Sequence, residues 1–77
     1  MPRYYFDFRD GTRAVIDQVG REFPGQGAAL QEAMLTARDA VTGIRLGLRH
    51  YGGWTLEVRD ESGRVIHAVP IPKKVSR

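Results

Sequence analysis

The chain has 77 residues, of which 42 % are hydrophobic and 27 % charged, a size and balance typical of one small folded domain rather than a disordered chain. It contains no cysteine, which excludes disulfide bonds and thiolate metal sites. No segment approaches the roughly 18 consecutive apolar residues of a membrane span. The first residues lack the apolar core of a signal peptide, so we expect a cytoplasmic protein that does not associate with membranes.

The charges are distributed unevenly along the chain, whose net charge is +3. Residues 1–37 carry four Lys or Arg and five acidic residues, whereas residues 38–77 carry eight Lys or Arg and four acidic residues. Such a basic half is compatible with an acidic or phosphate-bearing partner. The alternative, which we favour, is a solvated surface that ends in a basic tail.

The first part of the chain predicts a β-hairpin. Residues 3–9 alternate in the manner of a half-buried strand, and one of its faces is aromatic: Tyr4, Phe6 and Phe8. Asp10-Gly11 is a favoured hairpin turn, and residues 12–17 are expected to return as a second strand. Residues 18–24 contain glycine and proline and are expected to form a loop anchored by Phe23.

An apolar stripe then predicts a helix that begins near Gly25–Gly27. Its members recur at spacings of 4, 3, 4, 3 and 4: Leu30, Met34, Ala37, Val41, Ile44 and Leu48. Gly43 and Gly47 weaken the second half, by about 1 kcal/mol each relative to alanine. The helix therefore ends either near Thr42 or near Arg49, and the continuing stripe favours the longer helix.

A second hairpin follows the break at Gly52-Gly53. Residues 54–59 alternate as a third strand, and residues 60–63 form a turn that ends in glycine. Residues 64–69 form the fourth strand, which two prolines terminate, and residues 73–77 are expected to be a flexible basic tail.

These elements predict an α+β fold of the order hairpin–helix–hairpin (ββαββ), in a single domain of residues 1–72. Because each hairpin has an apolar face too small to be stable alone, we expect a mainly antiparallel four-stranded sheet with the helix packed on one face. The predicted core consists of Tyr4, Phe6, Phe8, Leu30, Met34, Ala37, Val41, Ile44, Leu56 and Val58. In particular, the helix stripe is predicted to face the aromatic and aliphatic side of the sheet.

The sheet face away from the helix is the best candidate for a functional surface. Alternation places Tyr5, Arg9, Thr55 and Arg59 on it, and aromatic and arginine side chains on an open sheet can stack on bases and pair with phosphates. The acidic residues of the same face oppose phosphate, and the alternative is a cross-strand ladder in which Asp7 or Glu57 lies beside Arg9 or Arg59. The candidate nucleic-acid or partner contacts are therefore Tyr5, Arg9, Arg38, Arg45, Arg49 and Arg59.

Other chemistry-bearing residues do not form a recognisable motif. The two histidines, His50 and His67, have no second ligand at metal-binding spacing. The carboxylates of Asp7, Asp17 and Glu57 are expected to form part of a solvated strand face. We therefore predict no catalytic, cofactor-binding or metal-binding residues.

Several short motifs are spread over most of the chain: Met1-Pro2-Arg3-Tyr4-Tyr5-Phe6-Asp7, Arg9-Asp10-Gly11, Ala37-Arg38-Asp39, Leu56-Glu57-Val58-Arg59-Asp60-Glu61 and Gly63-Arg64. With these motifs the chain resembles a family of short, uncharacterised alphaproteobacterial proteins. That family has no assigned activity, so the resemblance implies no catalytic residue. The order of hairpin, proline-containing loop and alanine-rich helix also resembles small antitoxins with a partial ribonuclease-H-like fold.

These observations predict a small non-enzymatic binding module that acts through protein–protein association, as a homodimer. The alternative is a nucleic-acid-binding or antitoxin-like regulator that uses the basic half of the chain. An enzyme is the least favoured reading, because a short chain without a nucleophile constellation has little with which to build an active site.

Overall fold

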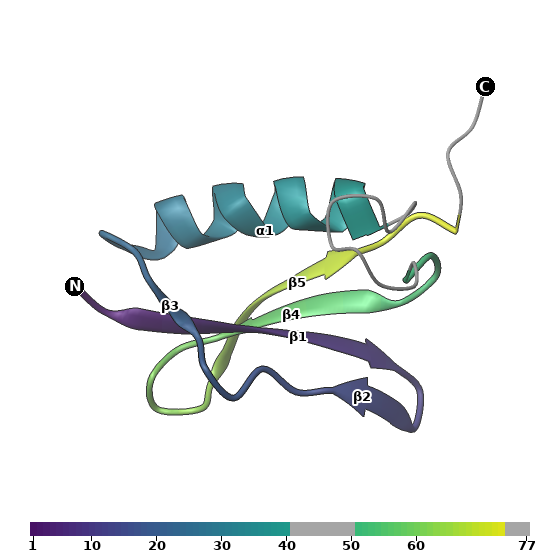
Figure 1. Ribbon diagram of the computed structural model, residues 1–77, viewed down its shortest axis with the longest axis horizontal. Coiled ribbons are helices and arrows are strands. Elements are labelled where there is room, and N and C mark those ends of the chain that lie inside the picture. The colour runs from purple at the N-terminus through teal and green to yellow at the C-terminus, as the bar shows by residue number, and fades with distance from the viewer. Residues whose placement is uncertain (41–50, 74–77) are drawn as a thin grey trace.

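The computed structural model describes residues 1–40 and 51–73, and these residues form an antiparallel sheet with a helix on one face (Figure 1). The predicted α+β class is therefore confirmed. Among the described residues the elements are β1 (Arg3–Asp10), β2 (Arg13–Val15), β3 (Arg21–Glu22), α1 (Gln26–Ala40), β4 (Thr55–Arg59) and β5 (Val65–Pro70).

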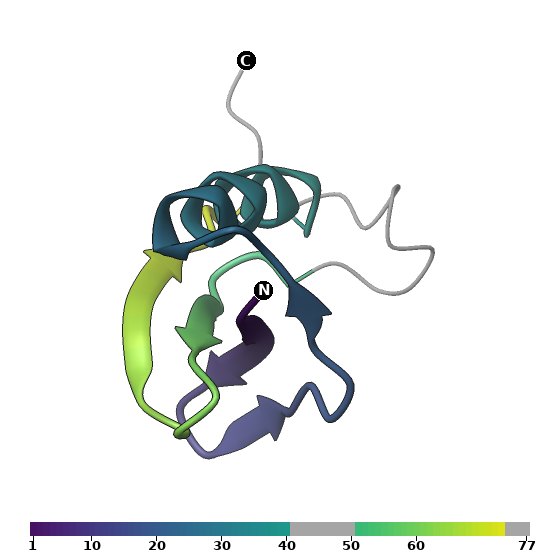
Figure 2. The same ribbon diagram turned by 90° about the vertical axis from the view of Figure 1, so that its left-hand side faces the viewer.

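The longest strand, β1, organises the sheet. It pairs with β2 on one side and β4 on the other, and β5 pairs with β4, so the order is β2-β1-β4-β5 with every pairing antiparallel. The register sets Phe6 opposite Val58 and Phe8 opposite Leu56, which brings the apolar residues of both hairpins to the same side. Figure 2 shows that the sheet curls beneath α1, with β5 and β3 on opposite sides.

The edge beside β1 differs from the prediction. The second strand ends at Val15 instead of residue 17, and the predicted loop of residues 18–24 contains the short strand β3, which pairs with the start of β1. Between these two pairings, three residues of β1 have no strand partner on this side, because Ile16–Gly20 departs from the sheet. The interruption arises because the Asp17 side chain accepts the Phe6 N–H (3.1 Å), which supplies a partner that strand pairing does not provide there.

The helix packs on the sheet through small side chains, and this corrects the predicted stripe. The buried residues of α1 are Ala29, Ala33, Ala37 and Ala40. Ala37 faces the sheet as predicted, but Met34 is 57 % exposed and Leu30 lies outside the buried core. The helix is rotated in this way because the sheet side already supplies bulky groups, so a layer of alanines lets the two layers approach closely.

The remaining core comes largely from β1, β4 and the segments that flank β4 and β5. Its members outside the helix are Tyr4, Tyr51, Leu56, Val58 and Ile71, with Phe6, Phe8, Phe23, Trp54, Ile66 and Val69 packed against them. The rings of Phe8 and Tyr51 stack at 4.2 Å, and Trp54 meets Tyr51 edge-on at 5.1 Å. The strands and their flanking segments thus supply the large apolar side chains of this thin core.

The second hairpin forms as predicted, except that β5 includes Pro70, which pairs with Thr55 instead of ending the strand. Strand β4 covers five of the six residues expected, and Asp60 holds the turn because its Oδ1 accepts the N–H groups of Ser62 (2.9 Å) and Arg64 (3.0 Å). The predicted helix end, at Thr42 or Arg49, falls within residues 41–50, which lie outside the described residues. The predicted tail, apart from Lys73, lies outside them as well.

Candidate functional site

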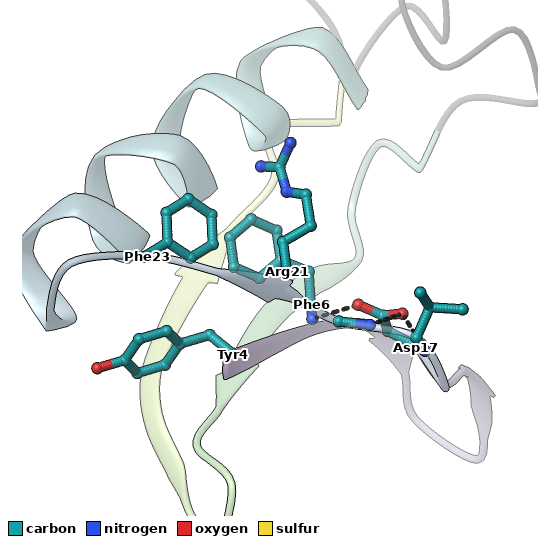
Figure 3. Close-up of a pocket in the computed structure, with 7 residues that line it drawn as sticks. Tyr4, Phe6, Asp17, Arg21 and Phe23 are labelled. Atoms are coloured by element: carbon teal, nitrogen blue, oxygen red, sulfur yellow. Dashed lines mark hydrogen bonds between the residues drawn. The ribbon is translucent and has the colours of Figure 1, made fainter. Parts of the chain in front are cut away.

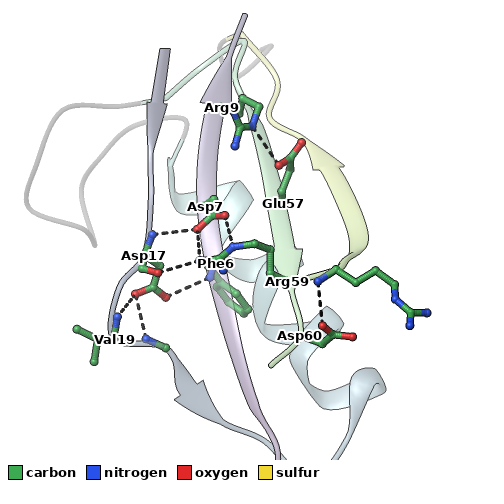
Figure 4. Close-up of polar contacts among 10 residues, drawn as sticks. Phe6, Asp7, Arg9, Asp17, Val19, Glu57, Arg59 and Asp60 are labelled. Atoms are coloured by element: carbon green, nitrogen blue, oxygen red, sulfur yellow. Dashed lines mark hydrogen bonds and ion pairs between the residues drawn. The ribbon is translucent and has the colours of Figure 1, made fainter. Parts of the chain in front are cut away.

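The sheet face away from α1 carries a polar network centred on Asp7, which is 1 % exposed (Figure 4). Arg59 donates from Nε to Asp7 Oδ2 at 2.6 Å and from Nη2 to Asp7 Oδ1 at 3.2 Å, a bidentate ion pair. The backbone N–H of Asp17 also donates to Asp7 Oδ1, at 2.9 Å. The buried carboxylate is therefore paired with a cation, and each of its oxygens accepts a hydrogen bond.

Asp17 links this network to the interrupted edge of the sheet. Its Oδ2 accepts the Phe6 N–H, and its Oδ1 accepts the N–H groups of Val19 and Gly20, both at 3.0 Å. Burial by itself would raise the pKa of Asp17, but the hydrogen bonds from Gly20, Phe6 and Val19 outweigh it, with help from the charge of Arg59, and the pKa is lowered. Asp17 is therefore held as a carboxylate that organises the backbone around it.

Three predicted contact residues belong to this face. Arg9 donates to Glu57 at 3.1 Å, and the Arg59 guanidinium lies 4.8 Å from the centre of the Tyr5 ring. Hydrogen bonds to Asp7 raise the pKa of Arg59, although burial opposes the shift. The cross-strand ladder is thus present, and these side chains are engaged with one another rather than directed at a ligand.

The structure corrects the expectation that Asp7 belongs to a solvated face. Ile16–Gly20 passes over Asp7 and covers it. Arg59 holds this segment in place by donating to the carbonyl oxygen of Asp17 at 3.0 Å. Gly20 has a φ of 72°, and a Cβ there would lie 2.8 Å from the Tyr5 ring. The sequence signal that could have indicated this arrangement is the aspartate followed three residues later by glycine, a spacing compatible with a side-chain-capped turn.

A pocket of about 280 Å³ lies on the other side of the same edge (Figure 3). Phe6 and Phe23 stack at 5.9 Å, Tyr4 lies 6.0 Å from Phe23, and the Arg21 guanidinium lies 5.1 Å from the Phe23 ring. Both charged groups are satisfied, since Arg21 pairs with Glu32 at 3.1 Å and Asp17 accepts backbone N–H groups. Among the described residues that line the pocket, the two charged side chains are therefore already engaged within the protein.

A larger groove, of about 430 Å³, runs along the outer face of α1. Its lining residues are Gln31, Met34, Leu35 and Arg38. Leu35 is 45 % exposed, and Met34 more so, which leaves two large apolar side chains side by side in solvent. Arg38, a predicted contact residue, lies at one end of the groove and makes no ion pair within the residues that the structure describes.

The remaining candidate residues are placed as follows. Arg45 and Arg49 lie outside the described residues, and so does His50. His67 lies opposite Val58 in β5, and its buried Nε2 has no hydrogen-bond partner among the described residues. Residues 1–40 and 51–73 contain no group of three histidine, aspartate or glutamate side chains arranged to hold a metal ion. The exposed apolar pair on α1 was missed, because the sequence pattern assigned Met34 to the core.

The fold defines a small α+β domain in which an antiparallel sheet carries one described helix. The model of the family described as "Domain of unknown function (DUF6894)" matches residues 3–72, so the chain belongs to this family. No curated protein matches the chain, and no solved structure does. The part of the chain that the structure describes contains no helix long and apolar enough to cross a membrane.

Proposed function

We propose that this chain is a non-enzymatic binding module that acts by associating with another protein, and that it forms a homodimer. The observation that carries the proposal is the orientation of α1, which packs its alanines against the sheet and leaves the larger apolar residues Met34 and Leu35 exposed. Covering such side chains contributes roughly 25 cal/mol per Å² of apolar surface removed from water. Association would therefore add apolar burial that the thin core of the monomer lacks.

The polar face of the sheet supports the same proposal. Asp7, Asp17 and Arg59 satisfy one another, and Arg9 pairs with Glu57. A general acid or base needs a pKa near the working pH, whereas the contacts of this network lower the pKa of Asp17 and raise the pKa of Arg59, away from neutrality. This network is better suited to holding the interrupted edge of the sheet in place.

Light scattering coupled to size-exclusion chromatography tests the proposal over a wide range of protein concentrations. The chain has a mass of 8.7 kDa, and we expect the measured mass to rise toward twice that value as the concentration increases. A mass that stays at 8.7 kDa up to millimolar protein would contradict the homodimer.

The alternative function is a nucleic-acid-binding or antitoxin-like regulator. It is favoured by the charge of residues 38–77, which carry eight Lys or Arg against four acidic residues. The ion pairs of Arg9 and Arg59 argue against the sheet face as the binding surface, which leaves Arg38, Arg45, Arg49 and the basic tail. Binding to a labelled DNA or RNA should then fall steeply with salt, and replacement of Arg45 and Arg49 by glutamine should weaken it at low salt.

A further inference from the structure

Four residues form a single stripe on the face of α1 that points away from the sheet: Gln31, Met34, Leu35 and Arg38. Their spacing of i, i+3, i+4 and i+7 places them on one side of a helix. The buried alanines Ala29, Ala33 and Ala37 occupy the opposite side, so the stripe is accessible along its whole length.

We infer that two copies of the chain meet along this stripe with their α1 helices antiparallel, an inference that rests on the proposed homodimer. The spacing of the stripe reads the same in both directions. A two-fold axis between Met34 and Leu35 therefore sets Met34 of one copy against Leu35 of the other, and Gln31 against Arg38. An interface of this kind is self-complementary, as closed dimers require.

Charge selects the antiparallel arrangement. Arg38 lies near the C-terminal end of α1, makes no ion pair within the described residues, and would face the carboxamide of Gln31 in the second copy. The carboxylate of Glu32, the next residue along the helix, already pairs with Arg21 at 3.1 Å, so Gln31 is the polar group that faces Arg38. Parallel helices would instead set the two Arg38 side chains against each other and align the helix dipoles unfavourably.

The size of the helix sets the expected strength of the dimer. A helix of 15 residues is about 22 Å long, and two such helices in contact bury less than the roughly 1,200 Å² at the lower limit of stable interfaces. The association should therefore be reversible, with a dissociation constant in the micromolar range. Light scattering must therefore cover protein concentrations both below and above this range.

The first experiment compares Leu35→Glu with Val19→Glu, a matched change at an exposed apolar residue outside the stripe. Light scattering should show a dimer for the parent and for Val19→Glu, and a monomer for Leu35→Glu, with at least a 10-fold weaker association. Circular dichroism should show that both variants are folded, because both positions are exposed. A Leu35→Glu variant that dimerises like the parent would overturn this interface and leave the homodimer standing, whereas a monomeric parent would overturn both.

The second experiment determines the orientation by disulfide trapping, for which the chain offers a background without cysteines. Facing residues of two packed helices lie within disulfide reach, so Leu35→Cys should form a covalent dimer under mild oxidation. Gln31→Cys and Arg38→Cys should each remain monomeric alone and form a mixed disulfide when combined. Alone, each pair of identical cysteines is displaced by seven residues, roughly 10 Å along the helix axis, beyond the reach of a disulfide. Efficient trapping of Gln31→Cys with itself would indicate parallel helices and overturn the inference.

Discussion

Replacement of Arg59 should destabilise the domain far more than replacement of another arginine on the same face. Arg59→Gln removes the cation from Asp7, whose side chain is 1 % exposed and still receives one N–H from the backbone of Asp17. Removing one partner of a buried ion pair typically destabilises a protein by about 3–5 kcal/mol. Because the Arg59 side chain is itself 24 % exposed, we expect a smaller effect than this range, about 2–3 kcal/mol.

Arg9 provides the matched control for this change. It pairs with Glu57 across the same two strands, but its side chain is 43 % exposed, so Arg9→Gln should lower the free energy of unfolding by less than about 1 kcal/mol. A chain of 77 residues has a total stability of roughly 4–12 kcal/mol, so the larger effect is a substantial fraction of the whole.

The assay is urea unfolding followed by circular dichroism and by the fluorescence of Trp54, the one tryptophan of the chain. A double-mutant cycle with Asp7→Asn isolates the pair, and the double variant should be more stable than the sum of the single effects predicts, by about 1–3 kcal/mol. If Arg59→Gln and Arg9→Gln have equal effects, or if the cycle shows no interaction energy, Asp7 is not buried against Arg59 and the reasoning is wrong.

Other outcomes follow from the same contacts. Gly20→Ala should lower the free energy of unfolding by about 1–3 kcal/mol, because Gly20 has a positive φ and a tyrosine ring beside it. Gly27→Ala, in an open helical position, should raise the free energy of unfolding by up to about 1 kcal/mol. Urea unfolding measures both, and equal effects would argue against this packing. Since the pKa of Asp17 is lowered by folding, its contribution should be complete above its ordinary pKa of 3.8 and lost as the pH falls through the folded value. The stability difference between the parent and Asp17→Asn should therefore shrink below about pH 4, and a difference independent of pH would contradict the network. Ala33→Leu should overpack the helix–sheet interface and lower the free energy of unfolding by about 1–3 kcal/mol. Met34→Ala, measured by thermal unfolding at low protein concentration, should change this free energy by less than about 0.5 kcal/mol. A larger effect of Met34→Ala than of Ala33→Leu would indicate that Met34 faces the sheet.

Much of the architecture was predictable because it depends on neighbouring residues. Alternation located β1 and β4, and turn chemistry located both hairpins, since a strand side chain repeats every two residues and a turn constrains only a few torsions. Alternation also placed Tyr5, Arg9 and Arg59 on one face, where the register sets Tyr5 opposite Arg59. These features need no knowledge of what packs against them.

The helix shows where local pattern was insufficient. Hydrophobic spacing assigned Met34 to the core, but alanines one position earlier, such as Ala33, face the sheet instead. A stripe of larger residues and a stripe of small ones on the same helix are both possible core faces. The choice between them depends on the volume that the aromatic side chains of the sheet already fill, and that volume exists only in the folded domain.

The sequence by itself determined the fold class, the hairpins and the face on which the charged strand residues lie, because each follows from the periodicity of the backbone. Only the tertiary structure decided that Asp7 is buried, since its partners Asp17 and Arg59 are 10 and 52 residues away along the chain. The tertiary structure also decided that Ile16–Gly20 leaves the sheet, because there the Asp17 carboxylate accepts a backbone N–H of β1. Contacts over such separations depend on strand register and layer packing, which local periodicity does not specify.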